Sequence, residues 1–416
     1  MAMKKKPVTG MKDILPAEME IRSYVMDLIR TTYAGYGFNN IETPCVEHIE
    51  NLSSKQGGEN EKLIFKILKR GEKLRLEEAE GEADLVDSGL RYDLTLPLTR
   101  YYSNNANALS SPFKALQMGN VWRADRPQRG RFRQFMQCDI DILGENGPAA
   151  ETELVLATTT LLGKLDFHDF TIRINDRRIL KAMAQYSGFP EEKFDLVFII
   201  LDKMDKIGLD GVAAELVEEG FDPASVEKYL GLFRELDPDV EGLKKCAQKL
   251  EGVLAAEVVQ NLENIISTVE AVKSADFKMA FDPTLVRGMS YYTGPIFEIS
   301  MDEFGGSVGG GGRYDEMIGK FTGTPTSACG FSIGFERIVM LLMERNFRIP
   351  SARTKKAYLV DKNLTGEKYR ELLVKAQKER EEGFVVSLSM MKKNRKFQKE
   401  QLAAEGYTEI EEIFAD

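Results

Sequence analysis

The stretch WRADRPQRGRFRQFMQCDIDIL, residues 122–143, decides the fold of this 416-residue chain. In its second half, apolar side chains fall mainly on even positions, while cations, an amide and carboxylates fall on odd positions. That two-residue period is typical of a β-strand with one buried face. The preceding strand ends near Trp122, and Pro127 and Gly130 indicate a turn between the two. The stretch therefore predicts an antiparallel hairpin whose loop and polar face carry arginines.

The arginines of this hairpin suggest a ligand. Five of them fall within residues 122–135. Guanidinium groups bind phosphate oxygens in pairs, so several on one face suit a polyanion such as a nucleotide triphosphate. The alternative is a solvated strand surface with ordinary salt bridges. The same face continues with Gln137, Asp139 and Asp141, which supply acceptors for a cationic or hydrogen-bonding ligand beside a phosphate site.

Composition narrows the class of protein. Acidic residues outnumber basic ones by 66 to 56, which argues against indiscriminate nucleic-acid binding. No apolar run approaches the ~20 residues of a membrane span, and the N-terminus lacks the apolar stretch of a secretory signal, so we expect a cytoplasmic protein with no membrane partner. The four cysteines and two histidines show no metal-ligand spacing. We expect no protein-held metal and interpret the cysteines as buried thiols.

Secondary-structure patterns divide the chain into segments. Pro16 predicts the first turn of a helix that ends near Gly35. NNIETPCVEHI, residues 39–49, predicts a strand entering through a proline. Short strands are then predicted as far as residue 143, including KLRLEEA at 73–79 and LRYDLTLPLTRYY at 90–102.

The second half of the chain begins with a change in composition. Charged, helical segments predict a helical insertion over about 176–275. Strand patterns resume over 285–315, and ACGFSIGFERI, residues 328–338, predicts a strand running into a helix. After Pro350, alternating strands and helices predict a small α/β unit.

Other candidate binding residues lie in these later segments. Arg337 lies in the first turn of a predicted helix, and glycines nearby leave room for a ligand, although an arginine there is often structural. Arg287 precedes two tyrosines, for which a core position is the alternative. The glycine run at 309–312 lacks the lysine of a phosphate loop. It predicts a close-packed strand that places Tyr314 beside the ligand.

Six motifs occur in a fixed order: GMKDILP, LRYDLTLPL, WRADRPQRGRFRQFMQCDIDILG, LVRGMSYYTG, GGGGRYD and GFSIGFERI. Together they resemble histidyl-tRNA synthetase, a class II aminoacyl-tRNA synthetase family, over nearly the entire chain. The resemblance implies an α+β protein with an antiparallel-sheet catalytic domain over residues 1–350, including the helical insertion. It also implies an anticodon-binding-like α/β domain over residues 351–416, which is shorter than is usual in the family.

The resemblance implies roles for the arginines. Arg123 would hold the α-phosphate of ATP, Arg131 the phosphate tail and Arg337 the γ-phosphate. Asp125, which replaces a glutamate of many family members, would lie next to the adenine. Arg287 would face the α-phosphate and the histidine carboxylate. Arg123, Arg287 and Arg337 would then be the catalytic residues.

The resemblance also implies a histidine site. In this site, two aspartates replace glutamates of some bacterial members. The implied residues are Asp93, Thr95 and Gln137 for the α-amino group, and Asp141, Tyr292 and Tyr314 for the imidazole.

The implied substrates and partners are L-histidine, ATP with Mg²⁺, tRNA(His) and a second copy of the chain, with no organic cofactor. Pro44 matches the proline of the family's dimer-interface motif. Arg126 and Arg129 in the hairpin turn are candidate tRNA contacts. So are three lysines of MKKNRKFQK, residues 391–399, for which a solvated surface is the alternative. These lysines are Lys392, Lys393 and Lys396.

One related function stays open. A regulatory paralogue of the synthetases binds histidine in ATP-phosphoribosyltransferase without charging tRNA, and a short C-terminal unit would suit it. The retained Arg123, Arg287 and Arg337 favour the enzyme, because a regulatory subunit has no use for a complete triphosphate clamp.

Overall fold

The structure is a computed structural model that describes residues 3–53, 60–287, 291–350 and 352–415. The chain forms two compact units. The first consists of Met1–Asp13 and Val25–Leu341, and the second of Ile14–Tyr24 and Leu342–Asp416. Helix α1 (Pro16–Gly35) begins at the predicted proline and contributes to both units, as does α13 (Phe335–Glu344). The domain boundary that we predict after residue 350 stays a prediction.

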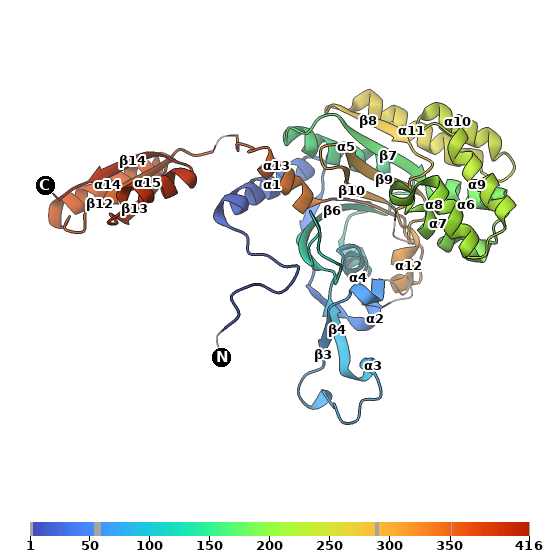
Figure 1. Ribbon diagram of the computed structural model, residues 1–416, viewed down its shortest axis with the longest axis horizontal. Helices are drawn as coiled ribbons and strands as arrows, with labels where there is room; N and C mark the ends of the chain where they lie inside the picture. The colour runs from blue at the N-terminus through green and yellow to red at the C-terminus, as the bar shows by residue number, and fades with distance from the viewer. Residues whose placement is uncertain (1–2, 54–59, 288–290, 351, 416) are drawn as a thin grey trace. The chain divides into compact units, whose positions relative to one another are not determined.

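An eight-stranded sheet forms the centre of the first unit (Figure 1). Its strands pair in antiparallel fashion, except for parallel pairs at each edge, β1 with β5 and β7 with β8. The α+β fold class predicted from the sequence is confirmed. In spatial order the strands are β1 (Asn39–Ile41), β5 (Phe113–Trp122), β6 (Gln134–Leu143), β11 (Ala328–Ile333), β10 (Gly306–Arg313), β9 (Pro295–Met301), β7 (Phe170–Asp176) and β8 (Phe277–Phe281).

The hairpin predicted from residues 122–143 is confirmed as β5 and β6, which pair from Trp122↔Gln134 to Phe113↔Leu143. Its polar face differs from a simple solvated surface. Asp139 and Asp141 are only 4% and 3% exposed, and they accept hydrogen bonds from Ser332 and Tyr314. Buried polar groups require partners, so this face is a candidate functional site.

Helix α5 (Ala149–Lys164) packs on β6 and β11 and carries a buried charge. Glu151 is fully buried and accepts two hydrogen bonds from Arg313, Nε to Oε1 at 2.6 Å and Nη2 to Oε2 at 2.9 Å. The guanidinium also donates to the main-chain oxygens of Glu145 and Gly147. The arginine of the GGGGRYD motif therefore anchors the end of β10 to α5, next to Tyr314.

Six helices follow β7 and precede β8, gathered to one side of the sheet in Figure 1. Three of them begin at an aspartate whose side chain accepts a main-chain N–H of the first turn: Asp176, Asp222 and Asp239. The helices occupy the range for which we predict an insertion. They are α6 (Arg177–Ser187), α7 (Phe194–Leu201), α8 (Met204–Glu218), α9 (Pro223–Glu235), α10 (Val240–Lys249) and α11 (Ala256–Val272).

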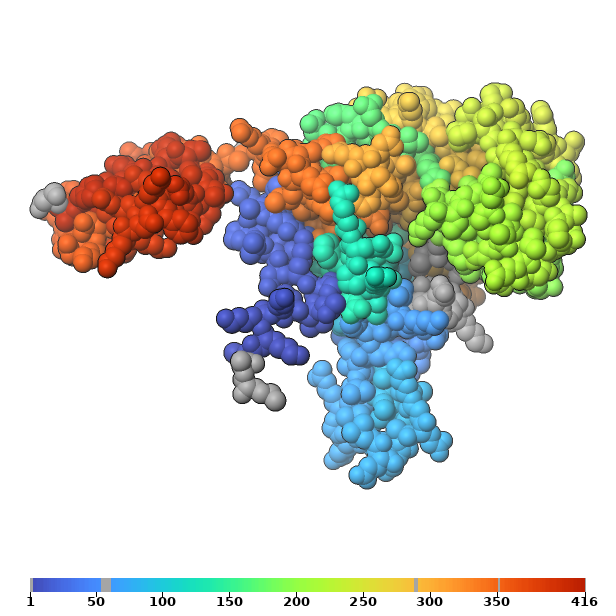
Figure 2. Space-filling view, viewed as in Figure 1, coloured from blue at the N-terminus to red at the C-terminus, as the bar shows by residue number. Residues whose placement is uncertain are grey.

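A small sheet of order β2-β4-β3 supports an arm that projects from the first unit in light blue in Figure 2. Several short elements complete the unit. They are β2 (Val46–His48), β3 (Lys66–Leu68), β4 (Val86–Leu90), α2 (Ile49–Leu52), α3 (Glu82–Leu85), α4 (Thr95–Asn105), α12 (Glu316–Thr322), η1 (Asn60–Leu63), η2 (Gly71–Lys73), η3 (Ala106–Ala108) and η4 (Glu191–Lys193).

Three local predictions in this region are wrong. Residues 90–102 are not a strand, because α4 begins at Thr95 with Pro97 in its first turn, where a missing N–H costs no hydrogen bond. Residues 73–79 form the end of η2 and turns. Residues 39–49 form two short strands separated by Pro44, not one. Cys45, next to that proline, is exposed, while the other three cysteines are buried as predicted.

The second unit contains a parallel sheet of order β13-β12-β14. Its core is formed by Tyr358, Val360, Leu372, Ala376 and Val386. The predicted alternation is confirmed, with one further strand, β14, that the acidic sequence YTEIEEI conceals. The elements are β12 (Lys355–Val360), α14 (Gly366–Glu381), β13 (Val385–Met390), α15 (Arg395–Ala404) and β14 (Tyr407–Ile413).

Within the described ranges, no helix combines the length and the apolar character that a membrane span requires.

The glycine run in β10 allows its neighbours to approach closely, as predicted. A Cβ on Gly311 would lie 1.9 Å from the main-chain oxygen of Gly330 on β11. A Cβ on Gly310 would lie 2.5 Å from the oxygen of Phe297, and one on Gly312 2.7 Å from that of Pro295. These obstacles are backbone atoms, which cannot rotate away, so β10 accepts no side chain at these positions.

We predict that Gly311→Ala lowers the free energy of unfolding by about 3 kcal/mol, because strand β11 must shift to admit the methyl group. Gly231→Ala is the matched control, since Gly231 lies inside α9 and, apart from its chain neighbours and the backbone of its own helix, no atom lies within 4 Å of an added Cβ. It should be neutral or stabilise by up to about 1 kcal/mol. Urea denaturation measures both, and equal stabilities of the two variants would contradict the close approach.

Candidate active site

A cavity of about 480 Å³ lies on the polar face of the sheet, where the hairpin loop meets the start of α13. Strands β6, β9, β10 and β11 contribute to its wall, as does the turn after α7. Its charged and polar side chains include Arg123, Asp125, Arg131, Gln137, Asp202, Arg287, Glu298, Ser332, Glu336 and Arg337.

The structure brings together the four arginines singled out in the sequence for a phosphate group, Arg123, Arg131, Arg287 and Arg337. Burial lowers the pKa of Arg337, and the charges of Arg131, Arg287 and Arg123 lower it further, against the opposing effect of Glu298. Such mutual repulsion costs free energy in the absence of an anion. The cavity is therefore suited to a ligand with several negative charges.

Each of two arginines is held by a different aromatic ring and a main-chain acceptor. The guanidinium of Arg123 lies 5.2 Å from the ring centroid of Phe135 and donates from Nε to the oxygen of Tyr92 at 2.8 Å. Arg337 lies 5.2 Å from the ring of Phe304 and donates to the main-chain oxygen of Ser307. These contacts fix the direction of both cations before a ligand binds.

Arg287 has a constrained position. Its φ of 61° is in the left-handed region, which is uncommon for a residue with a side chain. It donates to Glu298 at 3.0 Å, and its Cζ lies 2.7 Å from where a Cβ on Gly310 would be. Its Nε is buried and has no hydrogen-bond partner among the described residues. Because a buried donor needs an acceptor, this atom is available to a ligand.

The sequence reasoning missed three carboxylates on the wall, Glu298, Asp202 and Glu336. Glu336 accepts a hydrogen bond from the main-chain N–H of Met136 at 3.1 Å. Glu298 accepts from Arg287 and from Arg173, both at 3.0 Å, and Arg173 also pairs with Asp282 at 2.6 Å. Glu298 interrupts the apolar residues of β9, which was a usable signal. Asp202 comes from the turn after α7, and nothing in its local sequence points to the cavity.

The residues singled out for histidine form a second group beside the first. Tyr314 donates from its hydroxyl to Oδ1 of Asp141 at 2.5 Å. Both side chains use space left by Gly330, whose Cβ would lie 2.0 Å from Asp141 Oδ1. Tyr292 is buried against Gly312 in the same way. Tyr291, which the sequence reasoning left out of the site, packs edge-on against Tyr314 with ring centroids 6.0 Å apart.

The remaining members of this group lie at the start of α4 and on β6. Asp93 accepts from the N–H of Leu96 at 3.2 Å, and Thr95 is the first residue of the helix. Gln137 lies on β6 and lines the cavity, and its Oε1 is buried without a partner among the described residues. Gln137 therefore offers a hydrogen-bond acceptor at the junction of the two groups.

Three carboxyl groups in this region influence one another. Burial raises the pKa of Asp93, although the charge of Arg123 opposes it. Burial and the charge of Asp141 hold the pKa of Asp139 well above its usual range. Burial raises the pKa of Asp141 to about 7, against the effect of the Tyr314 hydrogen bond. A cationic or donor-rich ligand would stabilise the ionised forms.

No group of three or more histidine, cysteine, aspartate or glutamate side chains within the described ranges is arranged to hold a metal ion.

The candidate tRNA contacts lie elsewhere. Arg126 and Arg129 are exposed in the hairpin turn, where Arg129 lies 5.7 Å from the ring of Phe304. The three lysines of residues 391–399 are exposed in the second unit, around the start of α15. The other two cations of that run, Arg395 and Lys399, pair with Glu412 at 3.1 and 2.9 Å. The lysines form no ion pair with any described acid.

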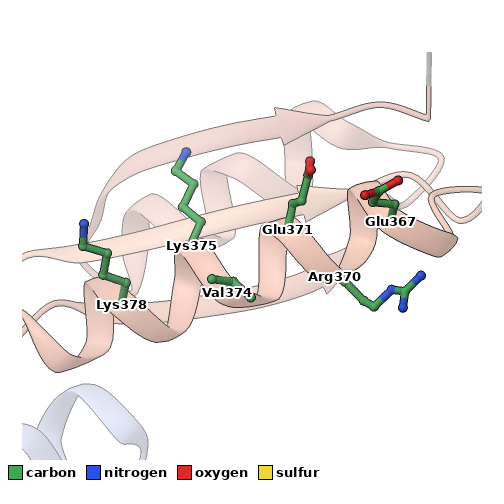
Figure 3. Close-up of a pocket in the computed structure, with 6 residues that line it drawn as sticks. All are labelled: Glu367, Arg370, Glu371, Val374, Lys375 and Lys378. Atoms are coloured by element: carbon green, nitrogen blue, oxygen red, sulfur yellow. The ribbon is translucent and has the colours of Figure 1, made fainter.

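A further hollow, of about 590 Å³, lies along α14 of the second unit (Figure 3). Its six lining side chains come from one helix and all are exposed. Lys375 pairs with Glu411 at 3.2 Å and lies 4.8 Å from the ring of Tyr358. The hollow has no buried polar group and is a solvated helix face.

Comparison with known proteins agrees with the fold and the site. The sequence profile of the family described as histidyl-tRNA synthetase matches residues 10–338. A histidine–tRNA ligase of Leifsonia xyli subsp. xyli is 47% identical over 346 residues, covering 81% of this chain and 80% of the relative. A probable histidine–tRNA ligase of Tropheryma whipplei is 40% identical and covers 97% of this chain and 95% of the relative.

Two solved structures are also similar. The crystal structure of histidyl-tRNA synthetase from Nostoc sp. PCC 7120 has a TM-score of 0.77 and 28% identity, covering 97% of this chain and 90% of that one. An ATP phosphoribosyltransferase regulatory subunit/histidyl-tRNA synthetase from Bacillus halodurans C has a TM-score of 0.79 over both full chains. At 19% identity, that likeness concerns the fold alone.

The central sheet, the arginines around its cavity and the order of the motifs define an enzyme of the class II aminoacyl-tRNA synthetases. Within that class, the chain belongs to the histidyl-tRNA synthetase family.

We predict a pH-dependent stability that depends on Asp141. Its pKa is higher in the fold than in the unfolded chain, so its stabilising contribution is complete below about pH 4 and is lost as the pH rises through 7. Between pH 4 and 7, the free energy of unfolding of the ligand-free parent should fall by on the order of 4 kcal/mol relative to that of Asp141→Asn. Urea denaturation at several pH values measures the difference.

The control is Asp210→Asn, at an exposed position on α8. Its stability should follow that of the parent at every pH. A constant difference between the parent and Asp141→Asn across the pH range would contradict the raised pKa.

Proposed function

We propose that this chain activates L-histidine with ATP to form histidyl-adenylate and transfers the histidyl group to the 3′ end of tRNA(His). One observation carries the proposal: β6 joins a cavity of four arginines to a buried group of carboxyls and tyrosines. At the junction, Arg287 has a buried donor and Gln137 a buried acceptor, both without partners among the described residues. A triphosphate beside a zwitterionic amino acid matches both groups.

The arginine cavity suits ATP. Arg123 would contact the α-phosphate, Arg131 the phosphate tail and Arg337 the γ-phosphate, with Asp125 beside the adenine. Arg287 would lie between the α-phosphate and the histidine carboxylate. Two observations support that position: its buried Nε has no hydrogen-bond partner among the described residues, and its Nη1 donates to Glu298. Arg123, Arg287 and Arg337 are thus the proposed catalytic residues.

The acidic group suits histidine. Gln137 and Asp93 would accept from the α-ammonium, with Thr95 beside them at the start of α4. Asp141, fixed by Tyr314, would accept a hydrogen bond from an imidazole N–H. An imidazole donor in a closed pocket requires such an acceptor, because an unpaired donor costs about 1–3 kcal/mol. The ring of Tyr292 would complete the pocket wall.

The proposed chemistry needs no protein nucleophile. A histidine carboxylate oxygen attacks the α-phosphorus, a new P–O bond forms, and the bond to the bridging oxygen of pyrophosphate breaks in line. A ribose hydroxyl of the tRNA then attacks the acyl carbon and AMP leaves. The protein contributes positioning and stabilisation of the charge that develops at the α-phosphate.

A Mg²⁺ ion fits this site as a companion of ATP. The carboxylates on the wall include Glu298 and Asp202, and this cation is usually bound by one or two carboxylates and the substrate's phosphates. When bound, it supplies neutralisation of phosphate charge.

The alternative function is that of a histidine-binding regulatory subunit of ATP-phosphoribosyltransferase, for which the Bacillus halodurans structure is a fold relative. Four arginines around one cavity favour the enzyme, since histidine binding alone does not need them. Histidine-dependent exchange of labelled pyrophosphate into ATP separates the two, because the regulatory subunit should give none. Absence of exchange by the parent protein would overturn the proposal.

We predict that Arg287→Ala lowers the rate of pyrophosphate exchange by roughly 10²–10³, the usual loss for one preorganised donor at a developing charge. Weak histidine binding should survive, because the carboxyls and tyrosines remain. The control is Arg234→Ala, which removes a surface ion pair with Glu227 on α9 and should leave the rate unchanged. A rate within about threefold of the parent would remove Arg287 from the catalytic residues.

For tRNA, the proposal adds a contact in the second unit. Lys392, Lys393 and Lys396 are exposed and have no acidic partner among the described residues, so their charge is available to phosphates. Arg126 and Arg129 would face the acceptor end near the first unit's cavity. A homodimer in the cytoplasm, with Pro44 at its interface, belongs to the same proposal.

We predict that changing these three lysines to glutamate weakens tRNA binding and flattens its salt dependence, because fewer phosphate contacts release fewer counterions. Pyrophosphate exchange should stay nearly intact, since the ATP and histidine sites lie in the first unit. A control with the same change in net charge is glutamate at Lys362, Lys368 and Lys378. Equal tRNA affinity of the parent and the first variant at low salt would contradict the contact.

A further inference from the structure

We propose that Asp139 is a positioning residue that turns the side-chain amide of Gln137 so that its oxygen faces the α-ammonium of histidine. The inference rests on the proposed function and concerns the same site. The resemblance to the family implies no role for Asp139. The hydrogen bonds on this face of the sheet support the positioning role.

Asp139 lies in the middle of β6, between Ser332 on β11 and Gln117 on β5. Ser332 donates from its hydroxyl to Oδ1 of Asp139. Gln117 is already engaged at both ends of its amide, since it accepts from Thr43 at 3.0 Å and donates to the oxygen of Leu94 at 3.1 Å. The second oxygen of Asp139 is therefore left to a neighbour on its own strand.

That neighbour is Gln137, two residues earlier on the same face. Its Nε2 donates to Oδ2 of Asp139 at 3.4 Å. An amide has one donor end and one acceptor end, so a bond from Nε2 decides where Oε1 points. Oε1 is the buried atom without a partner among the described residues. The pair thus presents an acceptor to the site, which suits an ammonium ligand.

The opposite orientation would be unfavourable. With the ammonium bound and Asp139 ionised, an amide turned over would place Oε1 against the carboxylate and the NH₂ group against the ammonium. Two hydrogen-bond acceptors would then face each other, and so would two donors. Burial and the charge of Asp141 raise the pKa of Asp139, so a cationic ligand nearby would also offset the cost of its ionised form.

Two other roles for Asp139 make different predictions. It could serve only to join β6 to β11 through Ser332, in which case its loss would weaken every ligand equally. It could also contact the ammonium directly, in which case its contribution would not depend on Gln137. A pair of ligands and a double variant separate these roles from positioning.

The test measures binding to the full chain by calorimetry. The ligands are L-histidinol, which has the α-amino group, and 3-(imidazol-4-yl)propan-1-ol, which lacks it. Asp139→Ala should weaken L-histidinol about tenfold, comparable to loss of one hydrogen bond to a charged group, and leave the second ligand within about twofold. Gln137→Ala should act in the same way. The double variant should bind L-histidinol within about twofold of Gln137→Ala alone.

The outcomes that would overturn the inference are distinct. Equal weakening of both ligands by Asp139→Ala would assign it a structural role only. Additive losses in the double variant would assign it a direct contact. If Asp139→Ala does not fold, Ser332→Ala tests the same chain of bonds and should weaken L-histidinol about threefold with the second ligand unaffected. Equal effects on both ligands there would likewise overturn it.

Failure of the underlying function looks different. A parent protein that shows no histidine-dependent pyrophosphate exchange would overturn the proposed function, whatever the variants do. A parent that exchanges normally, with an Asp139→Ala variant that binds both ligands as the parent does, would overturn the positioning role alone.

Discussion

The close approach of β10 to its neighbours is the constraint on which the rest of the structure depends. Side chains at Gly310, Gly311 and Gly312 would collide with backbone of β9 or β11. The space that these glycines and Gly330 leave is filled from the polar face by Arg287, Tyr292 and Asp141. The functional side chains thus stand where strand side chains would otherwise be, and they are packed tightly enough to hold one direction.

The site separates two groups that are each unfavourable alone. Arginines that lower the pKa of Arg337 lie next to carboxyls whose pKa values are raised by burial. The two groups adjoin at Gln137, which lines the arginine cavity and lies on the same strand as Asp139 and Asp141. Free energy stored in this way is recovered when complementary charges bind, which is why strongly shifted titrating groups collect at functional sites.

Local patterns in the sequence were enough for the hairpin, the first helix, the helical character of the segment between β7 and β8 and the α/β alternation at the end, because periodicity and turn residues act over a few neighbours. The start of α4 was not predicted, because Leu96 and Leu98 are two residues apart, as apolar residues are in a strand. Pro97, which lies between them, also suits the first turn of a helix. Strand β14 was not predicted, because it lies at a sheet edge and carries exposed glutamates. Its sequence therefore lacks the apolar pattern that indicates a strand.

The positions of Gln137 and Asp141 on one strand face follow from a two-residue period. Tertiary structure alone decides which of their atoms are free for a ligand. Oε1 of Gln137 is free because Asp139 engages the other end of the amide, and Asp139 is itself held by Ser332, 193 residues away. Asp202 reaches the cavity from the helical segment by the same kind of long-range packing. Hydrogen-bond partners and burial depend on contacts between distant segments, and no local pattern encodes them.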